Sequence, residues 1–470
     1  MTPAQPFDKL LEIVGDANFH QDDAAMVRFL DEPRDLFHKG ARCAVTPTSV
    51  AMVQKVMQFA YQNGVSVVPQ GGNTGLVGGQ VPANGNEIIL SLAKMRQVRD
   101  IDASTNVMTL EAGVTVLEAQ KHAEEANRLF PLSLGSEGTC QIGGILSTNA
   151  GGTAVLAYGN SRDLCMGVEA VLADGRIYNG LSKLRKDNTG YDLKDLLVGA
   201  EGTLGIITAA SMKMFPRPRA FETALLNIAS PQVGVDVFEI VRERSGNRLT
   251  SFELLPTIGI DLQLKHDLIG RDPRSHDTPS NWHILMELSL FEGDQDGALM
   301  AVLEELVEKG LVEDASVCNS LGDRQLMWLM RENYSECQKR EGDSIKHDIS
   351  VAIRDIPTLI EEVDAVAEEI LPGIRSVAFG HMGDGNIHYD FLAPEGFEGD
   401  LRASAPAIHA ATYEILARLN GSISAEHGIG QLKADLLAQK KDPTALDMMK
   451  SIKLALDPKN ILNPGKIVRP

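Results

Sequence analysis

Three separate glycine-rich stretches, residues 71–79, 135–152 and 199–208, constrain the fold of this chain more than any other feature. The first runs from Gly71 to Gly79 and holds five glycines in nine residues, too many for side-chain packing. Glycines let backbone N–H groups converge on an anion such as a pyrophosphate, because no Cβ atoms intervene. One such stretch alone is also typical of a surface loop. Three of them, each beside apolar, strand-like sequence, indicate loops gathered around one extended ligand.

Common nucleotide motifs do not account for the first stretch. It lacks the GxxxxGK[ST] pattern, and no helical pattern follows it, which disfavours a kinase-type phosphate loop or a Rossmann turn. Residues 46–70 instead predict strand, helix and strand, with a helix start at Thr46–Ser49, a helix end at Gly64 and a buried strand at Val65–Pro69.

The composition changes after residues 215–218, where glycine becomes less frequent. Residues 282–290 predict a strand, and residues 358–370 predict an amphipathic helix with acidic side chains on its outer face. These patterns favour an α+β fold with an antiparallel sheet in the second half. We expect a first domain at 1–217, a second domain at 218–415 and a small helical part at 416–470 that returns to the ligand site of the first domain.

Charge and cysteine content exclude several classes of protein. The formal charge of -20 disfavours nucleic-acid or anionic-membrane binding, and an acidic substrate would need local cations. Residues 1–16 do not resemble a signal peptide, and no apolar run is long enough for a membrane span. The five cysteines are scattered, with no CxxC pair, so we expect a reducing cytoplasm and no disulfide framework.

Two short segments in the last third carry metal-binding side-chain types. Residues 377–379 and 387–392 predict two strands joined by the turn Gly383–Asn386, which places His381 and His388 close together. The second segment, residues 424–428, offers Glu426 and His427. Imidazole and carboxylate ligands suit Zn²⁺ or a similar divalent ion. A lone histidine near a turn is usually a solvated side chain, and the remote Glu426 completes a site only if the fold brings it near.

The three glycine-rich stretches resemble the FAD-binding domain of the vanillyl-alcohol-oxidase or p-cresol-methylhydroxylase type. This resemblance makes residues 1–217 the expected FAD-binding domain and residues 218–415 the expected substrate and metal domain. The resemblance implies that the first loop binds the pyrophosphate and that the later ones line the isoalloxazine and adenine. The first loop has no histidine, so we expect FAD to be held non-covalently. The residues expected to bind FAD are Gly71, Gly72, Asn73, Thr74, Gly75, Leu76, Gly79, Gly138, Thr139, Gly143, Gly144, Ser147, Asn149, Gly152, Glu201, Gly202, Ile206 and Asn463.

Nearly the whole chain is similar to the FAD-linked D-2-hydroxyacid dehydrogenases, with the D-2-hydroxyglutarate group as the nearest match. The motifs that carry this likeness are residues 185–193, 381–388, 422–430 and 456–466. The resemblance implies that His381, His388 and Glu426 bind zinc and that His427 is the catalytic base. It also implies hydride transfer from C2 of a 2-hydroxy acid to N5 of the flavin.

Substrate choice depends on three further residues. In the hydroxyglutarate group, an arginine, a hydroxyl residue four positions later and a lysine fifteen positions after the arginine bind the second carboxylate. Arg331, Ser335 and Lys346 match this spacing, although threonine is more usual at the middle position. Each residue alone is typical of an ordinary surface. We also assign Asn386 and His427 to the substrate site.

The resemblance leaves alternatives open. D-lactate dehydrogenase and the FAD subunit of glycolate oxidase are relatives, and a non-catalytic FAD subunit is a third possibility that has no need for the histidines and Glu426. Reduced flavin requires a separate acceptor, and the family implies an electron-transfer flavoprotein or a quinone-linked carrier. A homodimer is compatible with the sequence.

Overall fold

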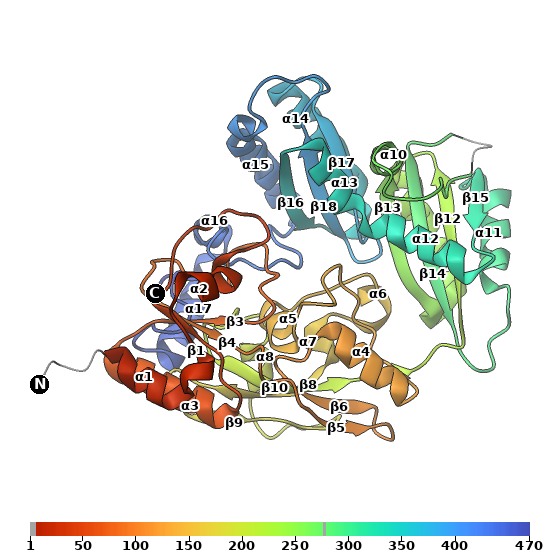
Figure 1. The fold of residues 1–470 in the computed structure, drawn as a ribbon. Helices are drawn as coiled ribbons and strands as arrows, with labels where there is room; N and C mark the ends of the chain where they lie inside the picture. The colour runs from red at the N-terminus through yellow and green to blue at the C-terminus, as the bar shows by residue number, and fades with distance from the viewer. Residues whose placement is uncertain (1–5, 276–278) are drawn as a thin grey trace, which may run out of the picture. The chain divides into compact units, whose positions relative to one another are not determined.

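The computed structural model describes residues 6–275 and 279–470, and the chain divides into two compact units (Figure 1). Unit 1 comprises Met1–Gly152, Gly159–Arg217 and Glu426–Pro470, and unit 2 comprises Thr153–Tyr158 and Pro218–Ala425. The C-terminal segment that joins unit 1 therefore begins at Glu426. The assignment of FAD binding and substrate binding to separate sequence ranges stays a prediction.

Unit 1 is built on two main sheets. The first has the order β1-β2-β4-β3, with β2, β3 and β4 parallel, and the second has the antiparallel order β5-β6-β10-β8-β9. A two-stranded ribbon pairs β7 with β11. The strands are β1 Phe19–His20, β2 Cys43–Val45, β3 Val67–Gln70, β4 Ile88–Ser91, β5 Val98–Asp102, β6 Val107–Glu111, β7 Arg128–Leu129, β8 Cys165–Val171, β9 Ile177–Asn179, β10 Ile206–Lys213 and β11 Phe215–Pro216.

Helices flank these sheets, and one buried core joins α3 to β2, β3 and β4. The helices of unit 1 are α1 Pro6–Val14, η1 Asp16–Asn18, α2 Asp23–Leu30, α3 Val50–Asn63, α4 Val116–Glu125, α5 Ile142–Thr148, α7 Ser161–Leu164, α8 Leu193–Leu197, α16 Ala434–Lys440 and α17 Pro443–Leu456.

Within residues 46–70 the predicted helix and second strand are confirmed as α3 and β3, whereas the first strand, β2, ends just before this range at Val45. Ser49 caps α3 by accepting from the Met52 N–H, and Gly64 ends the helix in the left-handed conformation, with φ of 62°. Within the second glycine stretch, residues 142–148 form the short helix α5. Asn149 ends α5 in the left-handed conformation, with φ of 54°. Inside the helix, the Ser147 hydroxyl donates to the Gly143 carbonyl.

Unit 2 is α+β with antiparallel sheets, as the sequence predicts. One sheet has the order β13-β14-β12-β15 and the other the order β16-β18-β17. Its strands are β12 Ala220–Ile228, β13 Leu249–Pro256, β14 Trp282–Leu290, β15 Asp314–Val317, β16 Ser344–Ser350, β17 Arg375–Phe379 and β18 Asn386–Leu392. Its helices are α6 Val155–Tyr158, α9 Pro231–Ser245, η2 Gly246–Arg248, α10 Thr257–Lys265, α11 Ala298–Glu308, α12 Leu321–Glu332, α13 Tyr334–Glu341, η3 Ile353–Asp355, α14 Ile356–Ile370 and α15 Leu401–Arg418.

The predicted strand at 282–290 and the hairpin at 377–392 are confirmed as β14 and as β17 with β18. The predicted amphipathic helix is α14, which buries Leu359, Ile360 and Val363 and leaves Glu361 and Glu368 exposed. In Figure 1, α14 and α15 lie beside β16 to β18. Among residues 6–275 and 279–470, no helix has the length and apolar character needed to cross a membrane.

Candidate active site

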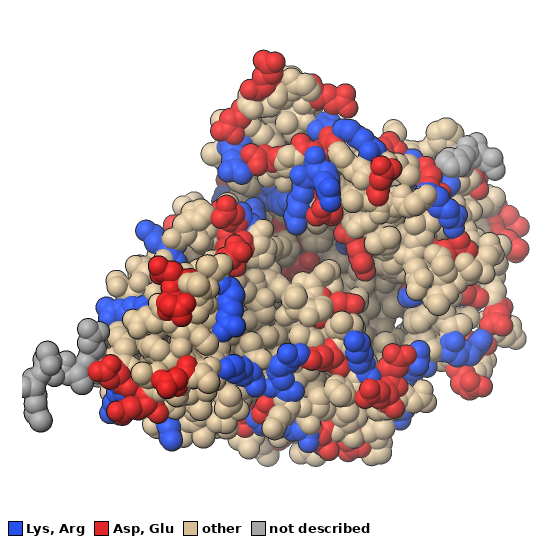
Figure 2. All heavy atoms as spheres, in the orientation of Figure 1, with Lys and Arg blue, Asp and Glu red and all other residues tan. Residues whose placement is uncertain are grey.

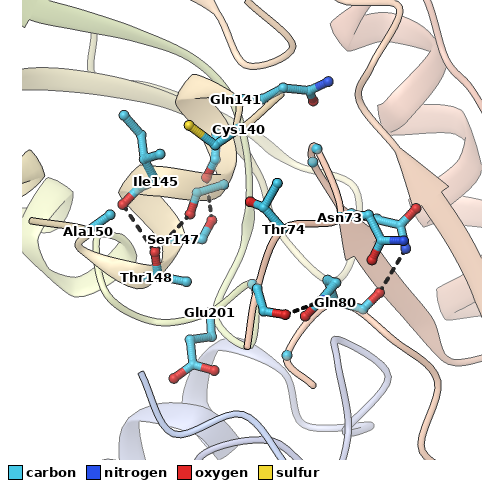
Figure 3. A pocket seen from close by; sticks show the side chains of 18 of the residues that line it. Asn73, Thr74, Gln80, Cys140, Gln141, Ile145, Ser147, Thr148, Ala150 and Glu201 are labelled. Carbon is cyan, nitrogen blue, oxygen red and sulfur yellow. Dashed lines mark hydrogen bonds between the residues drawn. The ribbon is translucent and has the colours of Figure 1, made fainter. Parts of the chain in front are cut away.

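A cavity of about 450 Å³ lies within unit 1, and all three glycine-rich stretches contribute to its wall. Figure 3 shows Thr74, Ser147 and Glu201, one from each stretch, around the same space. Residues distant in sequence complete the lining, among them Pro33 between α2 and β2, and Leu92 and Ala112 just after β4 and β6. The structure therefore brings together the loops that the sequence assigned to one extended ligand.

Two glycines show why this wall needs residues without a side chain. A Cβ on Gly72 would lie 2.0 Å from the Thr139 carbonyl oxygen, so the first and second stretches approach through bare backbone. A Cβ on Gly144 would meet no atom within 4 Å, although Gly144 lines the cavity. Gly144 thus leaves room for a bound group. These features fit a large planar cofactor with a pyrophosphate, such as FAD.

Most of the residues expected to bind FAD lie on the cavity wall. Those that do are Gly71, Gly72, Asn73, Thr74, Gly75, Leu76, Gly79, Gly143, Gly144, Ser147, Glu201, Gly202 and Ile206. Those outside the lining are Gly138, Thr139, Asn149, Gly152 and Asn463. Asn463 supports the wall instead, because its amide nitrogen donates to the carbonyls of Gly79 and Glu201, each at 2.8 Å.

Sequence reasoning missed several lining residues that carry no local signal. Gln70 and Gln80 are examples, and the amide of Gln70 bonds the Gln80 carbonyl at 3.1 Å and so holds the first loop closed. The apolar members Leu92, Ala112 and Ile145 look like ordinary core residues in the sequence. Only the approach of separate strands and loops brings them to one cavity.

Glu201 is a buried acid on the cavity wall. Its two carboxylate oxygens accept from the backbone N–H groups of Ile429 and Gly430, each at 2.7 Å. Burial raises the pKa of Glu201 to about 7, against these two bonds and the nearby charges of Lys433 and Lys466. Glu201 therefore joins the third glycine stretch to the C-terminal segment that follows His427.

Glu426 and His427 also line the cavity of unit 1. The His427 Nε2 atom lies 3.9 Å from a Glu426 carboxylate oxygen, and the two side chains are 28% and 21% exposed. Partial exposure leaves the imidazole accessible to a small molecule that enters the cavity. The predicted base thus lies at the wall where we expect the flavin.

In unit 2, one face of the β16–β18 ladder carries a row of polar side chains. Directly opposed residue pairs are Lys346 with Asp390, Asp348 with His388, and Ser350 with Asn386. The alternate positions, including Ile345, Ile349, Ile387, Tyr389 and Phe391, belong to the hydrophobic core. Side chains alternate across a strand, so the period of two separates this polar row from the core. The same alternation in residues 344–350 is the signal that would have identified Asp348.

Asp348 is the centre of this row. Its ligand oxygen and the His388 ring nitrogen lie within 4.8 Å of each other, a separation compatible with a shared cation. Asn386, expected to bind substrate, donates its amide N–H groups to Asp348 at 3.0 Å and to the Ile349 carbonyl at 3.1 Å. The structure therefore gives the Asn386 amide nitrogen two protein acceptors.

His381 lies at the mouth of the β17–β18 hairpin, as expected, with its ring centroid 5.5 Å from that of His388. Its Nδ1 atom lies 2.8 Å from Glu253 Oε1, and Arg331 Nε donates to Glu253 Oε2 at 2.5 Å. Burial disfavours the charged form of Glu253, but the adjacent His381 and Arg331 outweigh it and lower the pKa of this carboxyl to about 2. Glu253 is a site residue that the sequence did not reveal.

The expected cations of the substrate site are both paired with carboxylates. Lys346 Nζ donates to Asp390 Oδ2 and to Gln338 Oε1, each at 2.8 Å, and Arg331 is held by Glu253. Ser335 lies exposed near the start of α13. An unpaired buried cation is costly, which explains the pairing of Arg331, whose side chain is 9% exposed. Over the visible surface, acidic and basic side chains are likewise interspersed (Figure 2).

The chain itself connects the polar row to Glu426. The Ala425 N–H donates to Asp348 Oδ2 at 3.1 Å, and Glu426 is the next residue. The Cα atoms of Ala425 and Glu426 are therefore about 3.8 Å apart, the spacing of any two successive residues. Within unit 2, His381, His388 and Asp348 offer imidazole and carboxylate donors, which are ligand types that suit Zn²⁺ or a similar divalent ion.

Comparison with known proteins identifies the family. Residues 217–467 match the family model "FAD linked oxidases, C-terminal domain", and residues 41–180 match "FAD binding domain". The chain belongs to the FAD-linked oxidases. It is an FAD-dependent dehydrogenase, and curated relatives include a mitochondrial D-2-hydroxyglutarate dehydrogenase of Danio rerio, 39% identical over 89% of this chain and 77% of the relative.

Two further relatives are named for different substrates. A D-2-hydroxyglutarate dehydrogenase of Xanthomonas citri is 34% identical and aligned over 94% of both chains. A putative mitochondrial D-lactate dehydrogenase of Schizosaccharomyces pombe is also 34% identical, over 90% of this chain and 81% of its own. Among solved structures, p-cresol methylhydroxylase with substrate bound has a TM-score of 0.78 at 18% identity, covering 99% of this chain and 96% of that one. This likeness confirms the predicted vanillyl-alcohol-oxidase type of fold.

Proposed function

We propose that this dehydrogenase oxidises D-2-hydroxyglutarate to 2-oxoglutarate, with FAD held non-covalently and a divalent cation at the polar row of unit 2. The observation that carries the proposal is the place of His427, a partly exposed imidazole on the wall of the glycine-lined cavity. An alcohol oxidation at a flavin needs a base at that wall, and histidine is the side chain that most often takes this role.

In the proposed reaction, bound FAD, a bound divalent ion and the side chains of the protein have separate roles. Bound FAD would supply the acceptor for the hydride that leaves substrate C2, and a bound divalent ion would supply Lewis acidity toward the hydroxyl and carboxylate oxygens. His427 takes the hydroxyl proton, so the alcohol carbon becomes a carbonyl and two electrons leave the substrate. His381, His388 and Glu426 would hold the ion. A separate acceptor, such as an electron-transfer flavoprotein, would then reoxidise the flavin.

Arg331 supports recognition of a second carboxylate. Glu253 engages its Nε atom and Nη2 lies 3.5 Å from His381 Nε2, and a guanidinium carries five N–H donors that suit a carboxylate. Ser335 and Lys346 complete the proposed substrate contacts. A cytoplasmic location remains part of the proposal, whereas the relative from Danio rerio is named as mitochondrial.

A second candidate substrate is D-lactate. The pairing of Lys346 with Asp390 and of Arg331 with Glu253 makes these four groups neutral overall, which weakens attraction for a distal carboxylate. A monocarboxylate needs no such attraction. The balance of charges is therefore the specific observation in favour of this alternative.

Anaerobic flavin reduction tests the proposal directly. Purified protein is mixed without air with D-2-hydroxyglutarate, D-lactate or glycolate, and the loss of flavin absorbance is followed. Fast bleaching by D-2-hydroxyglutarate, at least tenfold faster than by the other two acids, is the expected result. Preference for D-lactate would replace the substrate assignment, and no bleaching by any acid would favour a non-catalytic FAD subunit.

A further inference from the structure

Glu201 holds the backbone of the segment that directly follows His427. Residues 426–430 form neither helix nor strand, so no regular hydrogen-bond ladder fixes their backbone. The Ile429 and Gly430 N–H groups donate to the two carboxylate oxygens of Glu201, each at 2.7 Å. Two successive N–H groups turned toward one anion form a backbone nest. In Figure 3 the Glu201 carboxylate points toward the pale blue ribbon of the C-terminal segment.

Glu201 itself is held in an uncommon backbone conformation. Its φ of 48° lies in the left-handed region, which a residue with a side chain rarely adopts. The Ser147 carbonyl accepts from the Glu201 N–H at 2.8 Å, and the Asn463 amide donates to the Glu201 carbonyl at 2.8 Å. Conformations of this kind persist where the surrounding structure holds them, and they are concentrated at functional sites. Here the buried side chain reaches the backbone of residues 429 and 430.

The turn between His427 and Ile429 depends on the contact with Glu201. Gly428 has φ of 83°, and a Cβ on it would lie 2.8 Å from Glu201 Oε1, closer than real Cβ atoms approach. Only glycine lets the backbone lie this close to the carboxylate. Two residues along the chain span at most about 7 Å, so any shift of Ile429 is transmitted directly to His427.

We propose that Glu201 is a positioning residue for the catalytic base: its carboxylate fixes the turn at residues 428–430 and so keeps the His427 imidazole at the cavity wall. This inference rests on the proposed function, which makes His427 the base. A residue that acts through the base changes the rate of the chemical step and leaves substrate affinity nearly unchanged. Misplacement of a reacting group by about 1 Å can cost about 100-fold in rate.

Glu201→Gln tests the contact with almost no change in side-chain volume. An amide has one acceptor oxygen, so it can accept from Ile429 or from Gly430 but presents an N–H group to the other. Glu87→Gln is the matched control. Glu87 is 1% exposed, lies in the same unit and also accepts from backbone N–H groups, those of the loop at residues 83–86. The control therefore also loses a buried carboxylate that holds a loop.

The measured quantity is the limiting rate of flavin reduction by D-2-hydroxyglutarate, followed without air in the FAD-loaded proteins. Glu201→Gln should lower this rate by about 10–100-fold and keep the half-saturating substrate concentration within about threefold of wild type. Glu87→Gln should keep the rate within about twofold of wild type. A wild-type rate in Glu201→Gln, or an equal loss in Glu87→Gln, would overturn the inference and leave the proposed function intact.

A double variant separates a positioning role from a general structural one. In His427→Ala the base is already absent, so addition of Glu201→Gln should cost no more than about threefold further in rate. If the double variant instead shows the full additional loss, Glu201 acts through FAD or the fold, and the inference fails. If His427→Ala alone reduces flavin at the wild-type rate, the proposed function loses its base and the inference falls with it.

Gly428→Ala disturbs the same contact from the other side and leaves Glu201 in place. Its Cβ would meet the carboxylate, so we expect a loss of rate of about 10–100-fold with FAD retained. Gly64→Ala is the control, because Gly64 also has a left-handed φ, 62°, and a Cβ there would meet no atom within 4 Å. A Gly428→Ala rate equal to that of Gly64→Ala would contradict the inference even if Glu201→Gln does not fold.

Discussion

Lys453 is the buried residue whose removal should most weaken the FAD-binding unit. Its Nζ atom donates to Asp457 Oδ2 at 2.6 Å, to the Leu462 carbonyl at 2.7 Å and to the Thr203 carbonyl at 2.9 Å. Thr203 follows the cavity residue Gly202, and Leu462 bridges to Val67 at the start of β3. One ammonium group therefore joins the C-terminal helix α17 to two parts of the cavity framework.

Replacement of Lys453 by methionine keeps the length of the side chain and removes all three donors. Asp457, fully buried, would retain only the N–H groups of Ile461 and Leu462. Loss of one partner of a buried ion pair costs about 3–5 kcal/mol, since the other charge stays buried without compensation. For a unit of this size, that cost corresponds to a midpoint lowered by roughly 6–20 °C.

Release of FAD on heating, followed by flavin fluorescence, reports unit 1, because the cavity expected to hold FAD lies in that unit. Tryptophan fluorescence reports unit 2, which holds both tryptophans. Lys459→Met is the control, because Lys459 is exposed and donates to the Tyr61 carbonyl at 2.9 Å, and its loss should cost under about 1 kcal/mol. The double variant Lys453→Met with Asp457→Asn should recover part of the loss, since the buried charge is gone. A midpoint for Lys453→Met no lower than that of Lys459→Met would refute the reasoning.

Four further predictions concern the proposed site and stability. His427→Ala should slow anaerobic flavin reduction by roughly 10²–10⁴-fold while FAD stays bound, and a rate near that of wild type would assign the base elsewhere. Chelation of divalent ions should abolish flavin reduction and added Zn²⁺ should restore it, whereas full activity in metal-free protein would disprove metal dependence. Lys346→Ala should lower kcat/KM for D-2-hydroxyglutarate by roughly 10–150-fold and for D-lactate by only a few-fold, and equal losses would argue against a distal-carboxylate contact. Burial opposes ionisation of Glu341, but hydrogen bonds from Lys265, Arg375 and His266 outweigh it and lower its pKa to about 2. The ionised Glu341 therefore stabilises the folded protein by roughly 3 kcal/mol above pH 4.5, and this stabilisation is lost as the pH falls toward 2. In Glu341→Gln, the stability measured by tryptophan fluorescence should fall less between pH 4.5 and 2 than it does in wild type.

Local patterns in the sequence determined much of the fold. Ser49 and Gly64 marked the ends of α3, because a side-chain cap and a left-handed residue are local requirements of any helix. The glycine-rich stretches identified most of the cavity wall for a similar reason: a backbone that must approach a ligand or another loop excludes a Cβ, as at Gly72. The turn at Gly383–Asn386 likewise predicted the hairpin that places His381 near His388.

The partners of the charged groups were decided only by the tertiary structure. Glu253 contacts His381, 128 residues away in the sequence, because Leu254 of β13 pairs with Gly380 after β17. No local sequence pattern predicts this pairing. The sequence predicted that Arg331 and Lys346 bind a substrate carboxylate, and only the structure shows that Glu253 and Asp390 are their partners within the protein. The period of two specifies which face of a strand is polar, but only the packing of distant strands decides which charged side chains meet on that face. Where such side chains are buried, neighbouring charges must have opposite signs.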